Sequence, residues 1–178
     1  MITGHVFIAT SLDGFIARPD GSIDWLEQPG TDAEDHGYDA FMARMDGLVM
    51  GRATFEKVLG FGFWPYEKPV IVLSRSLTPA SLPAEMAGRV RILNATPQEV
   101  FAQLEAEGWR HAYIDGGEVI RAFLTAGLIS ELILTQLPIL LGTGLPLFGH
   151  LPGDIALRHE GTHSFASGLV QSRYLIQG

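Results

Sequence analysis

The chain alternates short apolar runs with stretches in which apolar residues recur every three or four positions. Apolar runs bounded by turn residues are typical of buried strands, and a spacing of three or four indicates amphipathic helices. The first strands are predicted at residues 5–10, 47–50, 69–74, 90–93 and 111–115. The helices between them are predicted at 35–45, 52–59, 97–107 and 118–126. Alternating strands and helices predict an α/β fold with a mostly parallel sheet flanked by helices.

Helix 97–107 has the clearest end signals in the chain. Thr96 suits the N-cap position, and Pro97 suits the first helical position because it lacks an N–H group. Glu99 stands where a capping box requires an acid, and Gly108 follows the helix. This helix is therefore expected to start and stop at these residues.

The pattern changes after residue 127. Residues 131–141 are mostly apolar, and the segments 155–166 and 168–177 follow with no helix between them. These segments predict long strands that meet through turns, so the sheet is expected to have an antiparallel C-terminal hairpin. A chain of 178 residues, 47% hydrophobic and 18% charged, can bury a sizeable core. A single domain covering 1–178 is expected.

Composition removes several classes of function. A net charge of −8 disfavours nucleic acid as a partner, because phosphate backbones attract basic surfaces. The chain has no cysteine, and its six histidines do not stand at zinc-site spacing, so no metal is predicted. No apolar stretch approaches the roughly 18 residues of a membrane span, and the N-terminus does not resemble a signal peptide. A cytoplasmic protein with no membrane partner is expected.

Three predicted strand ends carry residues suited to an anion: Gly51-Arg52, Ser74-Arg75 and Gly116-Gly117. In open α/β sheets, ligands bind outside the carboxyl ends of the strands. A helix that starts there presents free N–H groups and the positive end of its dipole, and glycine allows close approach. Arg52 at a helix start conflicts with that dipole unless an anionic ligand is bound, although the side chain can also pair with Glu56.

Five segments together resemble the dihydrofolate reductase-like superfamily: IATSLDGFIA, VMGRATFE, VIVLSRS, YIDGGEVI and LILTQLPILLGTGLPLF. The chain is most similar to the C-terminal domain of the bacterial bifunctional deaminase–reductase of riboflavin biosynthesis, over about residues 4–176. This resemblance implies an NADPH-dependent reductase that acts on a pterin- or pyrimidine-like heteroaromatic substrate. No deaminase domain is expected, because no cysteine is available for its zinc site.

The resemblance also implies roles for particular residues on the cofactor side. The Gly-Arg-x-Thr element would hold the dinucleotide phosphates, the Ser-Arg strand end would lie beside the 2′-phosphate, and the Gly-Gly turn would meet the pyrophosphate. Two residues that flank the SLDG turn would contact the nicotinamide. In that order, the residues concerned are Gly51, Arg52 and Thr54; Ser74 and Arg75; Gly116 and Gly117; and Ala9 and Ile16.

On the substrate side, the resemblance implies one carboxylate early in helix 35–45, either Asp35 or Asp39, as the group that handles a proton. Either acid can equally be a solvated residue at a helix start. Thr135 matches a strand threonine that supports the substrate ring, or is an ordinary strand residue. Trp25 would stack on a flat substrate or simply anchor its loop.

The chain lacks the Pro-Trp pair typical of folate reductases, and this departure favours the riboflavin branch. Two alternatives remain: a true dihydrofolate reductase, and a protein that binds NADPH without catalysis. The apolar segment 137–148 predicts a homodimer, because exposed apolar patches of this kind mark interfaces.

Overall fold

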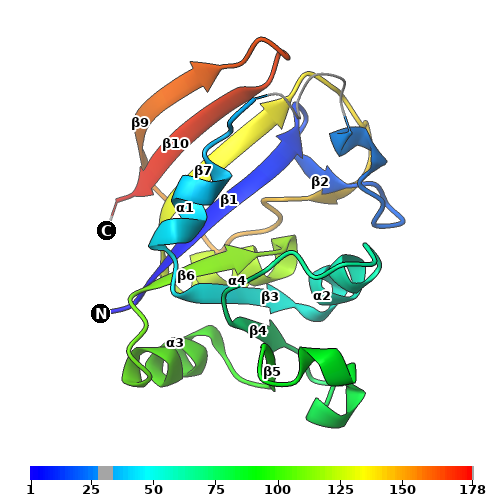
Figure 1. Ribbon diagram of the computed structural model, residues 1–178. Coiled ribbons are helices and arrows are strands. Elements are labelled where there is room, and N and C mark those ends of the chain that lie inside the picture. The colour runs from blue at the N-terminus through cyan, green and yellow to red at the C-terminus, as the bar shows by residue number, and fades with distance from the viewer. Residues whose placement is uncertain (28–33, 178) are drawn as a thin grey trace.

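The computed structural model describes residues 1–27 and 34–177 as one central sheet with helices on both faces (Figure 1). The sheet has eight strands in the order β5-β4-β3-β6-β1-β7-β10-β9. The first six strands in this order, from β5 to β7, pair in parallel. Strand β10 pairs antiparallel with β7 on one side and with the edge strand β9 on the other. The predicted α/β class, the mostly parallel sheet and the antiparallel C-terminal hairpin are confirmed.

The strands of this sheet and the four α-helices alternate along the chain as the apolar pattern predicts. The strands are β1 (Thr3–Ser11), β3 (Gly47–Gly51), β4 (Val70–Leu73), β5 (Val90–Leu93), β6 (His111–Asp115), β7 (Ile129–Leu137), β9 (Leu157–Ser164) and β10 (Val170–Ile176). The helices are α1 (Tyr38–Arg44), α2 (Arg52–Leu59), α3 (Pro97–Ala106) and α4 (Gly117–Thr125). A second sheet, which the sequence did not predict, pairs β2 (Phe15–Ala17) with β8 (Leu145–Pro146).

Side chains alternate between the two faces of the sheet and build two separate cores. On one face, Leu48 and Met50 of β3 pack with Phe41 of α1 and Phe55 of α2. On the other face, Val49 packs in the core that includes residues of α3 and α4. Helices α1 and α2 therefore cover one face of the sheet, where Tyr113 of β6 also packs, and α3 and α4 cover the opposite face.

The predicted helix 35–45 starts too early. Gly37 has a φ of 79° and occupies the N-cap position, so the helix begins at Tyr38. The Asp35 side chain accepts a hydrogen bond from the Gly37 N–H at 2.7 Å, which stabilises a turn before the helix. A side-chain oxygen that accepts a hydrogen bond from the backbone N–H two residues later competes with helix formation. This bond at Asp35 explains why the helix begins at Tyr38 and not at residue 35.

The predicted strand 131–141 is displaced toward the N-terminus, because β7 covers Ile129–Leu137. Pro138 has no N–H to donate to a neighbouring strand, so the ladder stops before it. The apolar residues beyond it run along the surface, where Ile139 accepts a hydrogen bond from the Leu12 N–H at 2.9 Å. At α3, in contrast, the predicted capping box is confirmed, since Thr96 and Glu99 exchange side-chain and backbone bonds.

Candidate active site

Two of the predicted strand ends meet in direct contact. Gly51 lies at the end of β3 and caps α2, and Gly116 lies between β6 and α4 with a φ of 89°. A Cβ atom added to Gly116 would lie 2.4 Å from Thr54 Oγ1 on α2. One added to Gly51 would lie 3.1 Å from Val119 of α4. The starts of α2 and α4 are therefore side by side, which places two sets of free N–H groups together.

Ile16 approaches the same place from the N-terminal part of the chain. A Cβ atom added to Gly117 would lie 2.8 Å from Ile16 Cδ1, and Gly117 is the first residue of α4. Ile16 belongs to β2, which follows the SLDG turn at the end of β1. The structure thus brings together Ile16, Thr54, Gly116 and Gly117, which the sequence assigned to one cofactor.

The third strand end joins the first through a groove of about 690 Å³. Arg52, Ser74 and Arg75 all line this groove, together with Asn94 and Thr96 from the next strand end. Arg52 is half-exposed, and its Nη1 lies 3.7 Å from Glu56 Oε1, so the alternative pairing with Glu56 is present but weak. Ser74 Oγ accepts hydrogen bonds from the Ser76 and Leu77 N–H groups, which fixes the turn that presents Arg75.

Ala9 and Thr135 lie opposite each other on the paired strands β1 and β7. Thr135 is only 5% exposed, and its Oγ1 accepts a hydrogen bond from Gln171 Nε2 at 2.9 Å. The same Nε2 donates to the carbonyl of His36 at 3.0 Å. Gln171, which the sequence did not single out, therefore ties the segment before α1 to the middle of the sheet.

Trp25 is only 3% exposed and packs with Leu137 and Leu169, with Ala9 at the margin of the same cluster. Such burial matches the loop-anchoring alternative for this side chain. The two candidate acids are both exposed: Asp35 hydrogen-bonds the Gly37 N–H, and Asp39 lies in the first turn of α1. Both are thus in the environment of a solvated residue at a helix start.

A different acid lies in the environment that proton transfer requires. Asp115 is the last residue of β6, lies opposite Met50 of β3, and is partly shielded from solvent. Burial raises the pKa of Asp115 to about 6, although a hydrogen bond from the Gly116 N–H at 2.8 Å acts in the opposite direction. A carboxyl group with a pKa in this range can hold or release a proton near neutral pH.

The charge of Asp115 acts on three tyrosines, and we call these four residues the tyrosine–aspartate cluster: Tyr38, Tyr66, Tyr113 and Asp115. Burial, followed by the charge of Asp115, raises the pKa of each tyrosine, to about 12 for Tyr38. Tyr113 donates a hydrogen bond to the Phe7 carbonyl at 2.9 Å, and the rings of Tyr38 and Phe7 meet edge to face with centroids 5.5 Å apart. Asp115 at the carboxyl end of β6 is therefore close enough for its charge to act on three tyrosine hydroxyls.

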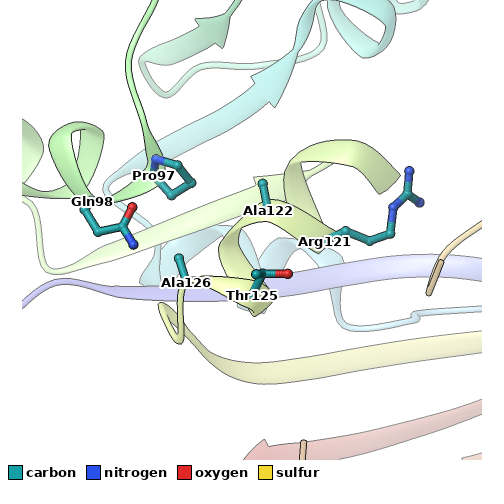
Figure 2. Close-up of a pocket in the computed structure, with 6 residues that line it drawn as sticks. All are labelled: Pro97, Gln98, Arg121, Ala122, Thr125 and Ala126. Carbon is teal, nitrogen blue, oxygen red and sulfur yellow. The ribbon is translucent and has the colours of Figure 1, made fainter. Parts of the chain in front are cut away.

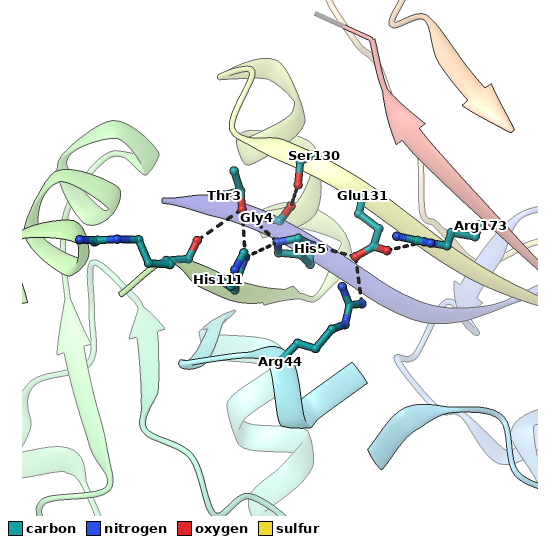
Figure 3. A network of polar contacts seen from close by, with 9 residues as sticks. Thr3, Gly4, His5, Arg44, His111, Ser130, Glu131 and Arg173 are labelled. Atoms are coloured by element: carbon teal, nitrogen blue, oxygen red, sulfur yellow. Dashed lines mark hydrogen bonds and ion pairs between the residues drawn. The ribbon is translucent and has the colours of Figure 1, made fainter. Parts of the chain in front are cut away.

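A second polar network lies near the opposite ends of the strands (Figure 3). The buried Glu131 accepts hydrogen bonds from His5 Nδ1 at 2.8 Å, Arg173 Nε at 2.5 Å and Arg44 Nη2 at 3.1 Å. Burial alone would raise the pKa of Glu131, but these three donors outweigh it and lower the pKa to about 2. The carboxylate is thus charged at neutral pH, and it joins β1, β7 and β10 to the last turn of α1.

A shallower groove of about 400 Å³ lies between the start of α3 and one side of α4 (Figure 2). It is lined by Pro97, Gln98, Arg121, Ala122, Thr125 and Ala126. The guanidinium group of Arg121 is held by the carbonyls of Pro146 and Leu147, at 2.8 and 3.2 Å from Nη1. No residue that lines this groove is an acid, a histidine or a tyrosine, so it offers no group for proton transfer.

Comparisons with known proteins agree with this geometry. Residues 3–171 match the model of the RibD C-terminal domain family. Protein YwjB of Bacillus subtilis (strain 168) is 37% identical over 173 residues, which cover 96% of this chain and 95% of YwjB. The crystal structure of a putative riboflavin biosynthesis protein from Shewanella sp. PV-4 superposes with a TM-score of 0.93 at 41% identity, over 99% of this chain and 100% of that chain.

A more distant structure shares the fold alone. The diaminohydroxyphosphoribosylaminopyrimidine deaminase/5-amino-6-(5-phosphoribosylamino)uracil reductase of Thermotoga maritima superposes with a TM-score of 0.72 at 12% identity. The match covers 99% of this chain but 57% of that longer one. Within the part of this chain that the structure describes, none of the helices is long and apolar enough to cross a membrane.

Proposed function

Because the chain belongs to the RibD C-terminal domain family, we propose that it is an NADPH-dependent reductase of a pterin- or pyrimidine-like heterocycle. Membership of this family supports a reductase-like function of the riboflavin-biosynthesis type, but it specifies neither the cofactor nor the substrate. The observation that carries the finer proposal is the convergence of three anion-suited strand ends beside a buried, protonatable Asp115.

The described residues fit a dinucleotide with an extra phosphate. The paired starts of α2 and α4 suit a pyrophosphate, and at Gly116 and Gly117 a Cβ atom would collide with neighbouring side chains. The groove between Arg52 and Arg75 suits the 2′-phosphate, since two guanidinium groups and Ser74 line it. Glu99 and Glu118 line it as well, and the Glu99 carboxylate is already bound by the N–H and hydroxyl of Thr96. When bound, NADPH supplies a hydride to an electron-poor carbon of a C=N or C=O bond and is left as NADP⁺.

The reduction also needs one proton, on the nitrogen or oxygen of the same double bond. We assign this proton to the Asp115 carboxyl group, because the site is shielded and its pKa of about 6 keeps a protonated fraction near neutral pH. The exposed Asp35 and Asp39 fit this role less well, because both side chains face solvent at the start of α1. The value of kcat/KM is expected to fall as pH rises above about 6.

Thr135 and Gln171 would hold the ring beside the cofactor. The hydroxyl of Thr135 already accepts from Gln171, so its own hydrogen is free to point to a substrate atom. Ala9, which is opposite Thr135, leaves space for the nicotinamide because its side chain is a single methyl group. The protein would thus supply position and a proton donor, while the cofactor supplies the electrons.

We also propose that the protein is a homodimer. Within the segment 137–148, Leu140 is 68% exposed, Leu145 45% and Phe148 43%, which is unusual for large apolar side chains. The edge strand β9 is exposed along its full length, so its free backbone groups can pair with a second copy. Sedimentation at micromolar concentration should give a dimer, and a monomer there would contradict this proposal.

The reductase proposal is tested first by thermal unfolding with and without NADPH, with NADH as the control. Ligand at about 100 times its Kd adds roughly 2.7 kcal/mol of stability, which corresponds to about 5–10 °C for a chain of this size. A shift with NADPH and little with NADH supports the 2′-phosphate site. No shift with millimolar amounts of either refutes the proposal, whereas a shift without NADPH oxidation by any pyrimidine, pterin or dihydrofolate would favour a non-catalytic binding protein.

A further inference from the structure

The order of the strands determines where the two ends of the proposed cofactor lie. The groove that Arg52 and Arg75 line spans the ends of β3, β4 and β5, and the paired helix starts follow β3 and β6. A dinucleotide with its 2′-phosphate in this groove and its pyrophosphate at the helix starts extends its other end toward the next strand, β1. The residues that follow β1 are therefore expected to border the nicotinamide ring.

The chain after β1 reaches the start of α4 at this place. The Ile16 Cδ1 atom lies 2.8 Å from the position of a Cβ atom on Gly117, and the Pro146 carbonyl lies 3.4 Å from it. Ile16 belongs to β2, which follows the carboxyl end of β1 and pairs with β8 (Figure 1). Residues 11–17 and 138–147 thus lie together beside the helix start, and we call them the paired segments.

One carboxylate, that of Asp13, holds the paired segments together. Its Oδ1 accepts a hydrogen bond from the Leu141 N–H at 3.1 Å, and its Oδ2 accepts one from the Gly142 N–H at 2.7 Å. The Ser11 hydroxyl donates to Oδ1 at 2.6 Å, and this bond, together with the two backbone bonds, lowers the pKa of Asp13. The Asp13 side chain is exposed, so its contribution is these bonds rather than apolar packing.

Backbone bonds join the paired segments on either side of Asp13. The Leu12 N–H donates to the Ile139 carbonyl at 2.9 Å, and the Leu147 N–H donates to the Gly14 carbonyl at 3.0 Å. Between these two bonds, Asp13 meets two N–H groups with two different oxygens. A carboxylate can accept at both oxygens, whereas an amide accepts at one and donates at the other. The position therefore requires an acid rather than a polar residue of the same shape.

We propose, on the basis of the reductase function inferred above, that Asp13 is a positioning residue for the nicotinamide ring. The carboxylate acts through Ile16, because it holds the paired segments together and so keeps that side chain beside the start of α4. A binding surface that is ordered before the ligand arrives loses less entropy on binding. Asp13 thus acts on the nicotinamide end of the cofactor and not on the phosphates, which lie at the other strand ends.

The test compares NADPH with ADP-ribose 2′-phosphate, which carries the same phosphates and lacks the nicotinamide ring. Both affinities are measured by calorimetry for the wild-type protein and for Asp13→Asn. We expect this variant to bind NADPH about five- to tenfold more weakly and ADP-ribose 2′-phosphate within about twofold of the wild-type affinity. Asp20→Asn is the matched control, because Asp20 is exposed and its Oδ1 accepts from the Ser22 N–H at 2.8 Å within one turn.

The fluorescence of the reduced nicotinamide ring gives a second readout, because its emission changes when the ring leaves water. At saturating NADPH, the emission of Asp13→Asn and Asp13→Ala should lie closer to that of free NADPH than the wild-type emission does. An equal change in affinity for both compounds, unchanged affinities, an equal effect of Asp20→Asn, or wild-type emission in both variants overturns the inference. Failure of the wild-type protein to bind either compound would instead refute the reductase function itself.

Discussion

Replacing Asp115 with Asn tests whether a buried carboxyl group has been retained for proton transfer at a cost in stability. The Asn side chain has the same shape, and its Oδ1 can still accept the hydrogen bond from the Gly116 N–H. It cannot ionise, so the substitution removes the titration and little else. We expect the variant to be more stable than the wild-type protein at neutral pH and to lose most of its reductase activity.

The magnitude follows from the pKa of Asp115, which burial raises from 3.8 to about 6. Between these two values the folded protein holds a proton that the unfolded chain has released, so wild-type stability falls as pH rises through this window. About two pK units at 1.36 kcal/mol each correspond to about 3 kcal/mol, fully expressed above pH 6. Below the unfolded value of 3.8, the contribution disappears.

The assay is urea unfolding of both proteins at several pH values from 4 to 7. The difference in unfolding free energy between the proteins cancels the titration of all other groups. It should move by about 2–3 kcal/mol in favour of Asp115→Asn across this range. A difference that stays constant with pH would show that Asp115 is not a buried titrating group, and the assignment of the proton to it would fail.

Three other substitutions test the cofactor groove, the glycine contact and the network of Figure 3. Arg75→Gln should weaken the binding of NADPH at least tenfold and leave the binding of NADH unchanged in thermal-shift titrations. The control is Arg89→Gln, at an exposed arginine outside the groove. An equal loss of affinity for both cofactors would contradict the 2′-phosphate site. Gly116→Ala should cost about 2–4 kcal/mol in urea unfolding, and the positive-φ control Gly62→Ala, with nothing within 4 Å, only about 1 kcal/mol. Glu131→Gln should lower the unfolding free energy by about 2–3 kcal/mol at pH 7. It should also remove the part of the stability that the wild-type protein loses as pH falls from about 4.5 to 2, because Gln cannot be protonated in this range. An unfolding free energy that falls with acid equally in both proteins would refute the role of Glu131.

The fold could be predicted well because its signals are local. The capping box at Thr96 and the strand–helix alternation depend on neighbouring residues, and the structure confirms both. The helix start at Arg52 is confirmed as well, and the helix predicted at 118–126 begins one residue earlier, at Gly117. The start of α1 was wrong, because Asp35 bonds the backbone of Gly37 and a spacing pattern does not record that bond.

The candidate acid illustrates where a sequence pattern stops being informative. Exposed Asp39 and buried Asp115 both stand beside elements of the site, and nothing in their immediate neighbours separates them. The difference arises because folding desolvates Asp115 at the end of β6, whereas Asp39 stays exposed in the first turn of α1. A pKa is set by this assembled environment, since desolvation depends on everything packed around the carboxyl group. An anion site at a helix start is instead encoded by consecutive residues, and so the sequence could propose the cofactor side of the site, whereas Asp115 becomes a candidate only in the folded structure.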